Sequence, residues 1–158
     1  MPPAAVSLTP QSIRIPTIAV TAPVGTLGFD EVAQTVEVPS KPMDAGWYRF
    51  GAVPGEDGSA VILGHVDSKT GPAVFARIKE LRRGDKVAVT MSDRSVVNYR
   101  VDEVATYPNA KFPAQRVYGA TGPSTLNLVT CGGAYDSTAG GYQSNVVVYT
   151  SLLTPRAG

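Results

Sequence analysis

The sequence contains a single cysteine and a single histidine, Cys131 and His65, and each follows directly after an apolar run. A cysteine thiolate is a strong nucleophile, and imidazole is the side chain best suited to moving protons near neutral pH. Each residue is followed by loop-type sequence, and strand ends on a rigid sheet commonly present catalytic groups. The pair therefore predicts nucleophilic catalysis in a fold that brings the two residues together.

Plainer interpretations of the two residues stay open at this point. A free cysteine is usually buried and inert, and a lone histidine is often only a hydrogen-bonded surface residue. Gly132 and Gly133 let a substrate approach the sulfur and free backbone N–H groups for an oxyanion, but glycines are also ordinary turn residues. A metal site is disfavoured because one His and one Cys would need two carboxylates, and no ligand pair has metal spacing. We predict no metal and no cofactor.

The bulk composition describes one compact domain. The chain has 158 residues, of which 43% are hydrophobic and 17% charged, with a formal net charge of +1. No basic cluster is larger than Arg82-Arg83, which argues against a nucleic-acid partner. The 16 Gly and 13 Pro are dispersed along the chain, as expected for many strands joined by many turns.

The N-terminal residues predict little structure. We expect residues 1–10 to be a mobile lead-in and residues 11–158 to form the domain. The opening Met1-Pro2-Pro3-Ala4-Ala5 has neither the basic nor the apolar region of a signal peptide, and no apolar run reaches the ~18 residues that span a bilayer. Either the natural protein is cytosolic, or this chain is an ectodomain behind an artificial initiator methionine.

Short runs of β type dominate the hydrophobic pattern. The run at 60–65 is continuously apolar, which predicts a strand buried on both faces. Residues 86–91 and 96–104 flank a turn at 92–95 and predict a hairpin. The remaining predicted strands are 12–15, 18–24, 35–39, 124–130 and 145–153. About eight short strands favour a β-barrel or sandwich over alternating βα units.

The other segments are predicted as one helix and several loops. Residues 72–81 predict a helix because Pro72 stands early and Val74, Phe75, Ile78 and Leu81 recur at spacings of three and four. Residues 107–118 are predicted irregular, and Gly132-Gly133 with 137–141 are predicted to form a loop.

Several motifs together resemble the sortases, most closely the class F sortases. Leu126-Asn127-Leu128-Val129-Thr130-Cys131 is similar to the family's strand ending in Thr-Cys, and Ala60-Val61-Ile62-Leu63-Gly64-His65-Val66-Asp67 is similar to its Gly-His strand. The further matches are Gly46-Trp47-Tyr48, Gly71-Pro72-Ala73-Val74-Phe75, Tyr107-Pro108 before Lys111-Phe112-Pro113, Cys131-Gly132-Gly133 and Asn145-Val146-Val147-Val148-Tyr149. They extend from about Ile13 to the end of the chain.

The resemblance implies an all-β fold, an eight-stranded sortase-type barrel with one or two short helices. It implies a cysteine transpeptidase that cleaves a Leu-Pro-x-Thr-Gly-type sorting signal between Thr and Gly and passes the acyl group to an amine, such as one on a cell-wall precursor. It also implies an extracytoplasmic enzyme held at the outer face of the membrane by an N-terminal anchor. This chain would then be the soluble ectodomain.

One position departs from the family pattern. Sortases use an arginine on the strand after the cysteine loop, between the Tyr and Asn matched here by Tyr142 and Asn145, and this sequence has Gln143 there. A neutral donor in place of a charged one costs roughly 1–2 kcal/mol, or about tenfold in rate. Gln143 acts alone, or Arg49, Arg77 or Arg116 replaces the missing charge, or the protein is a weak or inactive sortase-like peptide-binding module.

Neighbouring residues are candidates for supporting roles. Thr130 and Tyr142 are candidates for supporting the site, although Thr130 also suits a plain strand position. Asp67 is placed to orient His65, but an Asx-type turn is the preferred interpretation. Trp47 and Tyr48 are expected in the core, not in the substrate groove. An L,D-type transpeptidase is disfavoured because the Ser and Gly expected before its cysteine are missing.

Overall fold

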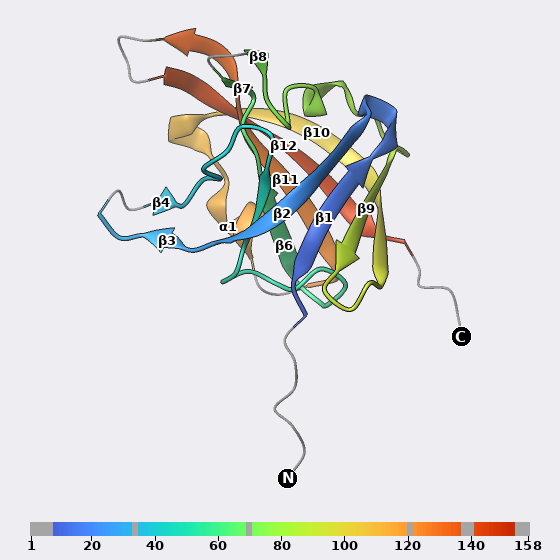
Figure 1. The fold of residues 1–158 in the computed structure, drawn as a ribbon. Helices are drawn as coiled ribbons and strands as arrows, with labels where there is room; N and C mark the ends of the chain where they lie inside the picture. Colours follow the sequence, from blue (N-terminus) through green and yellow to red (C-terminus); the bar gives the residue numbers. More distant parts are fainter. Residues whose placement is uncertain (1–7, 33–34, 69–70, 120–121, 137–140, 154–158) are drawn as a thin grey trace.

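The computed structural model describes residues 8–32, 35–68, 71–119, 122–136 and 141–153. Eight strands close into a barrel in the order β1-β2-β5-β6-β11-β12-β10-β9 (Figure 1). Their bounds are β1 Pro10–Ile15, β2 Val20–Leu27, β5 Ala45–Tyr48, β6 Ser59–Leu63, β9 Lys86–Met91, β10 Val96–Pro108, β11 Thr125–Asp136 and β12 Gly141–Leu152. The expected eight-stranded barrel is confirmed. No helix in the described ranges is long and apolar enough to cross a membrane.

Two of the neighbouring strand pairs are parallel, β2 with β5 and β6 with β11. The other pairs are antiparallel, including the β9–β10 hairpin, which confirms the pairing predicted around residues 92–95. Parallel neighbours share the same direction, so the C-terminal ends of β6 and β11 lie at the same edge of the barrel.

Alternation along the strands fills the barrel interior. In β1, Ile13 and Ile15 are buried while Arg14 between them is exposed. In β11, Leu126 and Leu128 belong to the same interior cluster. The two-residue period of these side chains is what a closed sheet with one packed face requires.

A second apolar layer covers part of the outer surface. Helix α1, Ala114–Tyr118, contributes Val117 to a cluster with Val61, Val129 and Val147 from the outward positions of β6, β11 and β12. The buried Asn127 side chain donates to the Val117 carbonyl at 2.8 Å, which ties the helix to β11. β6 is therefore covered on both faces, as its unbroken apolar sequence predicted.

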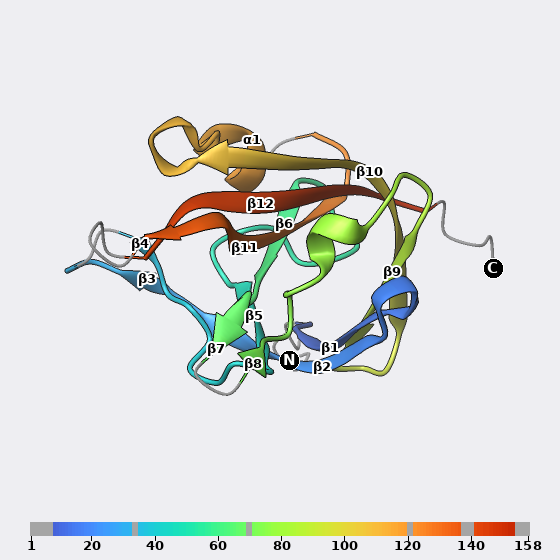
Figure 2. The same cartoon turned by 90° about the horizontal axis from the view of Figure 1, so that it is seen from above.

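A short hairpin projects from the barrel beside this layer. It consists of β3, Phe29–Asp30, and β4, Thr35–Val36, and it points away from the barrel in two perpendicular views (Figures 1 and 2). We call residues 28–39 the arm. At its base the Gly28 N–H donates to the Glu37 carboxylate at 2.5 Å, and the Glu37 N–H donates to the Gly28 carbonyl at 2.9 Å.

The prediction of a helix at residues 72–81 is wrong. Gly71–Pro72 forms β8 against β7, Asp67–Ser68, and turns then lead to a short 3-10 helix, η2, at Ile78–Glu80. The Ala73 and Phe75 N–H groups donate to the Val66 and His65 carbonyls. These amides therefore bond to the segment after β6 and are not available for an α-helix.

Two further segments differ from the prediction. The 107–118 region, expected to be irregular, completes β10 and contains the 3-10 helix η3, Asn109–Lys111, and then α1. Five residues after Pro113 are too few to show a helical period. The loop predicted at Gly132-Gly133 is instead the continuation of β11 against β12, with a register shift between Gly132 and Tyr135. A third 3-10 helix, η1, occupies Pro16–Ile18.

Candidate active site

The register of β6 and β11 brings the histidine and the cysteine to the same level. Val129 is paired with Leu63 in the parallel ladder, and the Gly64 N–H donates to the Val129 carbonyl at 3.1 Å. His65 and Cys131 each lie two residues beyond this last pair. Both residues therefore follow the last pair between β6 and β11, at the same edge of the barrel.

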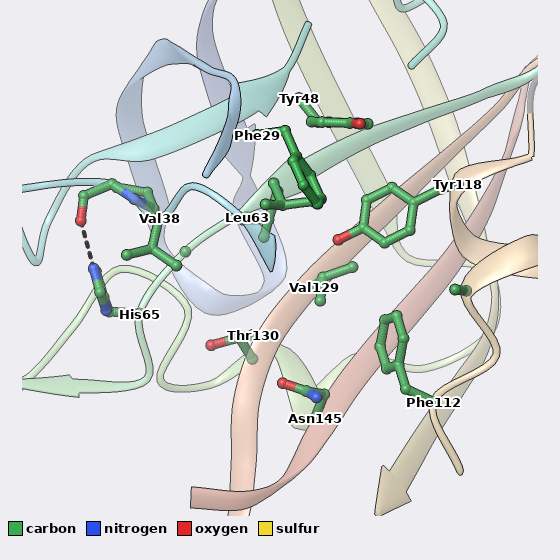
Figure 3. A pocket seen from close by; sticks show the side chains of 14 residues that line it. Phe29, Val38, Tyr48, Leu63, His65, Phe112, Tyr118, Val129, Thr130 and Asn145 are labelled. Carbon is green, nitrogen blue, oxygen red and sulfur yellow. Dashed lines mark hydrogen bonds between the residues drawn. The ribbon is translucent and has the colours of Figure 1, made fainter. Parts of the chain in front are cut away.

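An open cavity of about 590 Å³ lies on the outer side of this edge (Figure 3). Its floor consists of strand residues of the barrel, and its sides are contributed by the arm and by the segment that contains α1. The described lining residues are Phe29, Val36, Val38, Pro39, Tyr48, Leu63, Gly64, His65, Phe112, Ala114, Tyr118, Val129, Thr130 and Asn145. The cavity thus begins at the predicted catalytic histidine and extends between two elements outside the barrel.

The cavity is apolar and aromatic away from His65. The Tyr118 ring packs edge-on against Tyr48 at 5.3 Å between centroids, and Phe112 lies 6.3 Å from Tyr118. Figure 3 shows these rings grouped apart from His65. The described lining residues include no Asp, Glu, Lys or Arg. Such a surface suits an apolar peptide segment.

Tyr118 is the lining residue with the clearest change in its acid–base properties. Burial of the phenol, and secondarily the charge that Tyr48 acquires on ionisation, raise the pKa of Tyr118 from 10.0 to about 12. Burial has this effect because it penalises the charged phenolate. Tyr118 therefore remains a neutral hydrogen-bond donor throughout the physiological pH range.

His65 is half-buried and has a defined hydrogen-bond partner. Its Nε2 atom lies 2.6 Å from the carbonyl oxygen of Pro39, the contact drawn as a dashed line in Figure 3. Asp67, the other residue considered for orienting the ring, begins β7 and is not among the described lining residues. The arm therefore supplies an orienting contact to His65.

The other strand residues predicted for the site are found at or near this edge. Thr130 is buried and lines the cavity. Cys131 is paired with Asn145 in the β11–β12 register, and Tyr142 and Gln143 precede Asn145 in β12. The side chains of Cys131, Tyr142 and Gln143 lie outside the described part of the structure.

The three candidate arginines are not among the described residues that line the cavity. Arg49 is exposed, with its guanidinium 4.4 Å from the centroid of the Phe50 ring. Arg77 forms an exposed ion pair with Glu80 at 3.2 Å, and this contact raises the pKa of Arg77.

Arg116 on α1 has the most extensive contacts of the three. It pairs with Glu103 at 2.7 Å and lies 3.7 Å over the Tyr149 ring. The hydrogen bond to Glu103 raises the pKa of Arg116. These contacts hold α1 against β10 and β12, so Arg116 supports the cavity wall from outside.

The prediction for Trp47 is confirmed and that for Tyr48 is not. Trp47 is buried in the barrel interior, whereas Tyr48 points outward and lines the cavity. Successive residues of a strand face opposite sides, so a Trp-Tyr pair cannot both be interior. No pattern in the sequence pointed to Phe29 or Val38, because their position in the cavity depends on where the arm folds.

The described residues contain no group of three or more His, Cys, Asp or Glu side chains arranged to hold a metal ion.

Comparison with protein families gives one match, to the sortase domain, over residues 13–153. No curated protein matches the sequence. Among solved structures, the fold is similar to a lid mutant of sortase A from Corynebacterium diphtheriae, with a TM-score of 0.72, 18% identity, and coverage of 98% of this chain and 75% of that chain.

Two sortases of the C type are also similar. Sortase C-1 from Actinomyces oris aligns with a TM-score of 0.67 and 20% identity, over 90% of this chain and 72% of the other. Sortase C-1 from S. pneumoniae, as a mutant, aligns with a TM-score of 0.69 and 23% identity, over 94% of this chain and 68% of the other. At these identities the similarity establishes a shared fold.

Proposed function

Because the chain belongs to the sortase family, we propose that it is an active cysteine transpeptidase with Cys131 as nucleophile and His65 as acid–base partner. Sortases are generally cysteine transpeptidases that act on sorting signals, and they are typically associated with the cell envelope. The finer assignment to class F rests on the sequence motifs that end in Cys131-Gly132-Gly133 and Asn145-Val146-Val147-Val148-Tyr149.

The parallel register of β6 and β11 is the observation that carries the proposal. His65 and Cys131 follow the Leu63–Val129 pair by the same number of residues. Leu63 and Val129 both line the cavity, and alternate positions of a strand share a face. We therefore expect the sulfur to be presented to the same cavity as His65.

The proposed reaction has two acyl-transfer steps. The Cys131 thiolate attacks the carbonyl carbon of the signal's Thr, and the C–N bond to Gly breaks as His65 gives a proton to the leaving amine. A thioester to Cys131 remains. An incoming amine then attacks the thioester, His65 takes its proton, and the new amide leaves while Cys131 returns to the thiolate.

The oxyanion in each step needs hydrogen-bond donors. We propose that backbone N–H groups near Cys131 supply them together with Gln143, with Tyr142 and Thr130 in supporting positions. Arg77 and Arg116 are less favoured because each would first have to leave its carboxylate partner, Glu80 or Glu103. Arg49 packs over the Phe50 ring and is not among the described residues that line the cavity.

The cavity suits the apolar part of a Leu-Pro-x-Thr-Gly-type signal. Its aromatic and aliphatic walls favour burial of a leucine and a proline, while the reacting Thr–Gly bond would lie toward His65. The acceptor is an amine, and one on a cell-wall precursor would give protein anchoring at the outer face of the membrane.

A peptide assay with mass detection tests the proposal. The protein is incubated with a panel of fluorogenic Leu-Pro-x-Thr-Gly peptides and an amine acceptor, and intact mass is followed for an acyl adduct on Cys131. We expect cleavage between Thr and Gly, a transient adduct, and transfer to the amine. Cys131→Ala removes the adduct, and His65→Ala lowers kcat/KM by about 10²–10⁴-fold.

A second candidate function is peptide binding with little or no catalysis, favoured by the neutral Gln143 at the expected arginine position. Fluorescence anisotropy with a labelled peptide separates the two. Binding with no cleavage across the panel, and with Cys131 unreactive toward alkylating agents in the folded protein, would replace the enzyme with a binding module.

A further inference from the structure

The hydrogen bond between His65 and Pro39 has a consequence for which ring nitrogen does the chemistry. A carbonyl oxygen has lone pairs and no proton, so the Nε2 atom that lies 2.6 Å from it must be the donor. A neutral imidazole carries one proton, and with that proton on Nε2 the lone pair is on Nδ1. Nδ1 is then the basic nitrogen of the resting ring.

We propose that the Pro39 carbonyl orients His65 in the reaction, so that Nδ1 is the atom that gives and takes protons. This inference rests on the proposed transpeptidase function. When the ring is protonated, Nε2–H stays bonded to Pro39 and the Nδ1 proton passes to the leaving amine. When the second amine attacks, its proton returns to Nδ1. Pro39 is a positioning residue, since its carbonyl acts through the ring of His65.

The carbonyl stands where other catalytic histidines have a carboxylate. In Ser-His-Asp sites an aspartate fixes the tautomer and direction of the ring by accepting from its second nitrogen. Here the acceptor of the Nε2 proton is a main-chain oxygen. A neutral acceptor fixes the tautomer in the same way but adds no full negative charge beside the ring.

Glu37 holds the segment that presents this carbonyl. Two hydrogen bonds join Glu37 and Gly28 at the base of the arm, one through the Glu37 side chain and one through its main chain. Pro39 follows two residues later, and the Pro42 carbonyl accepts from the Val74 N–H at 3.0 Å on its other side. The carbonyl that orients His65 is thus fixed between two anchored points.

The same segment also faces the cavity. Val36, Val38 and Pro39 line it, together with Phe29 from the other strand of the arm (Figure 3). A peptide that displaces the arm would move the acceptor of His65, and a peptide that packs against the arm would hold it in place. Substrate contact and histidine orientation are therefore linked through three neighbouring residues.

The tautomer can be measured directly because the chain has a single histidine. Long-range ¹H–¹⁵N correlation spectra of uniformly ¹⁵N-labelled protein, recorded without peptide and with the ring neutral, report both nitrogens. We expect Nε2 to have the shift of a protonated nitrogen, Nδ1 that of an unprotonated one, and the Nε2 proton to be protected from exchange. Protonation on Nδ1, or an unprotected Nε2 proton, would overturn the inference.

A matched set of glutamate variants tests the role of the arm. Glu37→Ala removes the carboxylate that accepts from Gly28, whereas Glu37→Gln keeps an oxygen acceptor there. We expect Glu37→Ala to weaken the exchange protection of the Nε2 proton and to lower kcat by about three- to tenfold. We expect Glu37→Gln to retain most of the protection and most of kcat. Glu56→Ala, an exposed change outside the arm, controls for loss of a surface carboxylate.

An unchanged Nε2 signal in Glu37→Ala would refute the part assigned to the arm. The spectra need no substrate and no turnover, so they are read independently of the peptide assay. A protein that fails to cleave any peptide but shows the protected Nε2 proton would contradict the transpeptidase and not the orientation. Peptide cleavage by a protein whose neutral ring is protonated on Nδ1 would support the transpeptidase and contradict the orientation.

Discussion

The two sides of the cavity are built very differently. The barrel side consists of residues in strands β6, β11 and β12, and Leu63, Val129 and Thr130 are each at most 9% exposed. The arm side is open to solvent, with Phe29 41% and Val38 61% exposed. One side is fixed by ladders of hydrogen bonds, and the other by a two-stranded hairpin with a few contacts at its base.

Under the proposed function, this difference separates chemistry from recognition. His65 and Cys131 extend from buried strands, whose backbone cannot shift without breaking the barrel, so their relative position is preserved. The arm and the α1 segment supply most of the apolar surface that a peptide would contact. Peripheral elements tolerate change better than core strands, so we expect specificity to vary on the outer side and catalysis to depend on the barrel side.

The largest expected effect comes from altering the barrel side at Gly64. A Cβ at this position would lie 2.7 Å from Phe75 and 2.8 Å from Val74, both buried. Gly64→Ala should therefore lower the free energy of unfolding by about 1–3 kcal/mol and displace His65, so that kcat falls sharply. Urea unfolding and the peptide assay measure the two effects.

Gly25→Ala is the matched control for that change. Gly25 also lies in a barrel strand, β2, but a Cβ there would meet no atom within 4 Å. It should leave stability and kcat close to those of the unaltered protein. Equal losses in the two variants would mean that general strand effects, and not packing against the histidine segment, are responsible.

On the outer side, Tyr118→Ala should affect binding more than turnover. The Tyr118 ring lies between Tyr48 and Phe112 in the apolar end of the cavity. Its loss should raise KM about tenfold, equivalent to about 1.4 kcal/mol, with a smaller change in kcat. Phe50→Ala removes another ring that packs on Tyr48 but does not line the cavity, so its KM should change little.

Gln143→Arg tests the departure from the family pattern. If the neutral amide limits oxyanion stabilisation, a charged donor at this position should raise kcat by about tenfold. Gln143→Lys adds the charge without the planar guanidinium, so it should raise kcat by less than Gln143→Arg does. Unchanged kcat in both variants would indicate that another group already supplies the charge, and would direct attention to Arg49.

The barrel strands could be predicted because the hydrophobic pattern of each strand lies within a few consecutive residues. The continuous run at 60–65 and the alternation at 12–15 identified β6 and β1, and the motifs around His65 and Cys131 identified the family. The extension of β11 through Gly132 and Gly133 was missed, since glycines favour turns and only pairing with β12 keeps them extended.

The outer side of the cavity could not be predicted in the same way. Tyr48 was expected in the core, and nothing in the sequence connected Phe29, Val38 or Pro39 to His65. Their positions depend on contacts between distant segments, such as the bonds between Gly28 and Glu37 and the approach of Pro39 to the imidazole. The candidate catalytic residues could be named from the sequence, whereas the groups that contact His65 and line the cavity could not.

The smallest effect we predict is a change in how folding stability depends on pH, and it comes from ionisation of the Tyr118 phenol. Its folded-state pKa is raised to about 12, so the folded protein holds this proton more tightly than the unfolded chain, whose tyrosines titrate near 10. The resulting stabilisation is complete below about pH 10 and is lost as the pH rises toward 12. Tyr118→Phe should remove this loss of folding stability between about pH 10 and 12, and it should leave the fold at neutral pH intact.

Difference spectroscopy of tyrosinate between the unaltered protein and Tyr118→Phe measures this directly. Tyr99 and Tyr149 also have raised pKa values through burial, and subtraction removes their signals. We expect the difference to be centred well above pH 10. A difference centred near pH 10 would show that water reaches the Tyr118 phenol freely, and the apolar end of the cavity would then be less enclosed than the packing of Tyr48 and Phe112 around it implies.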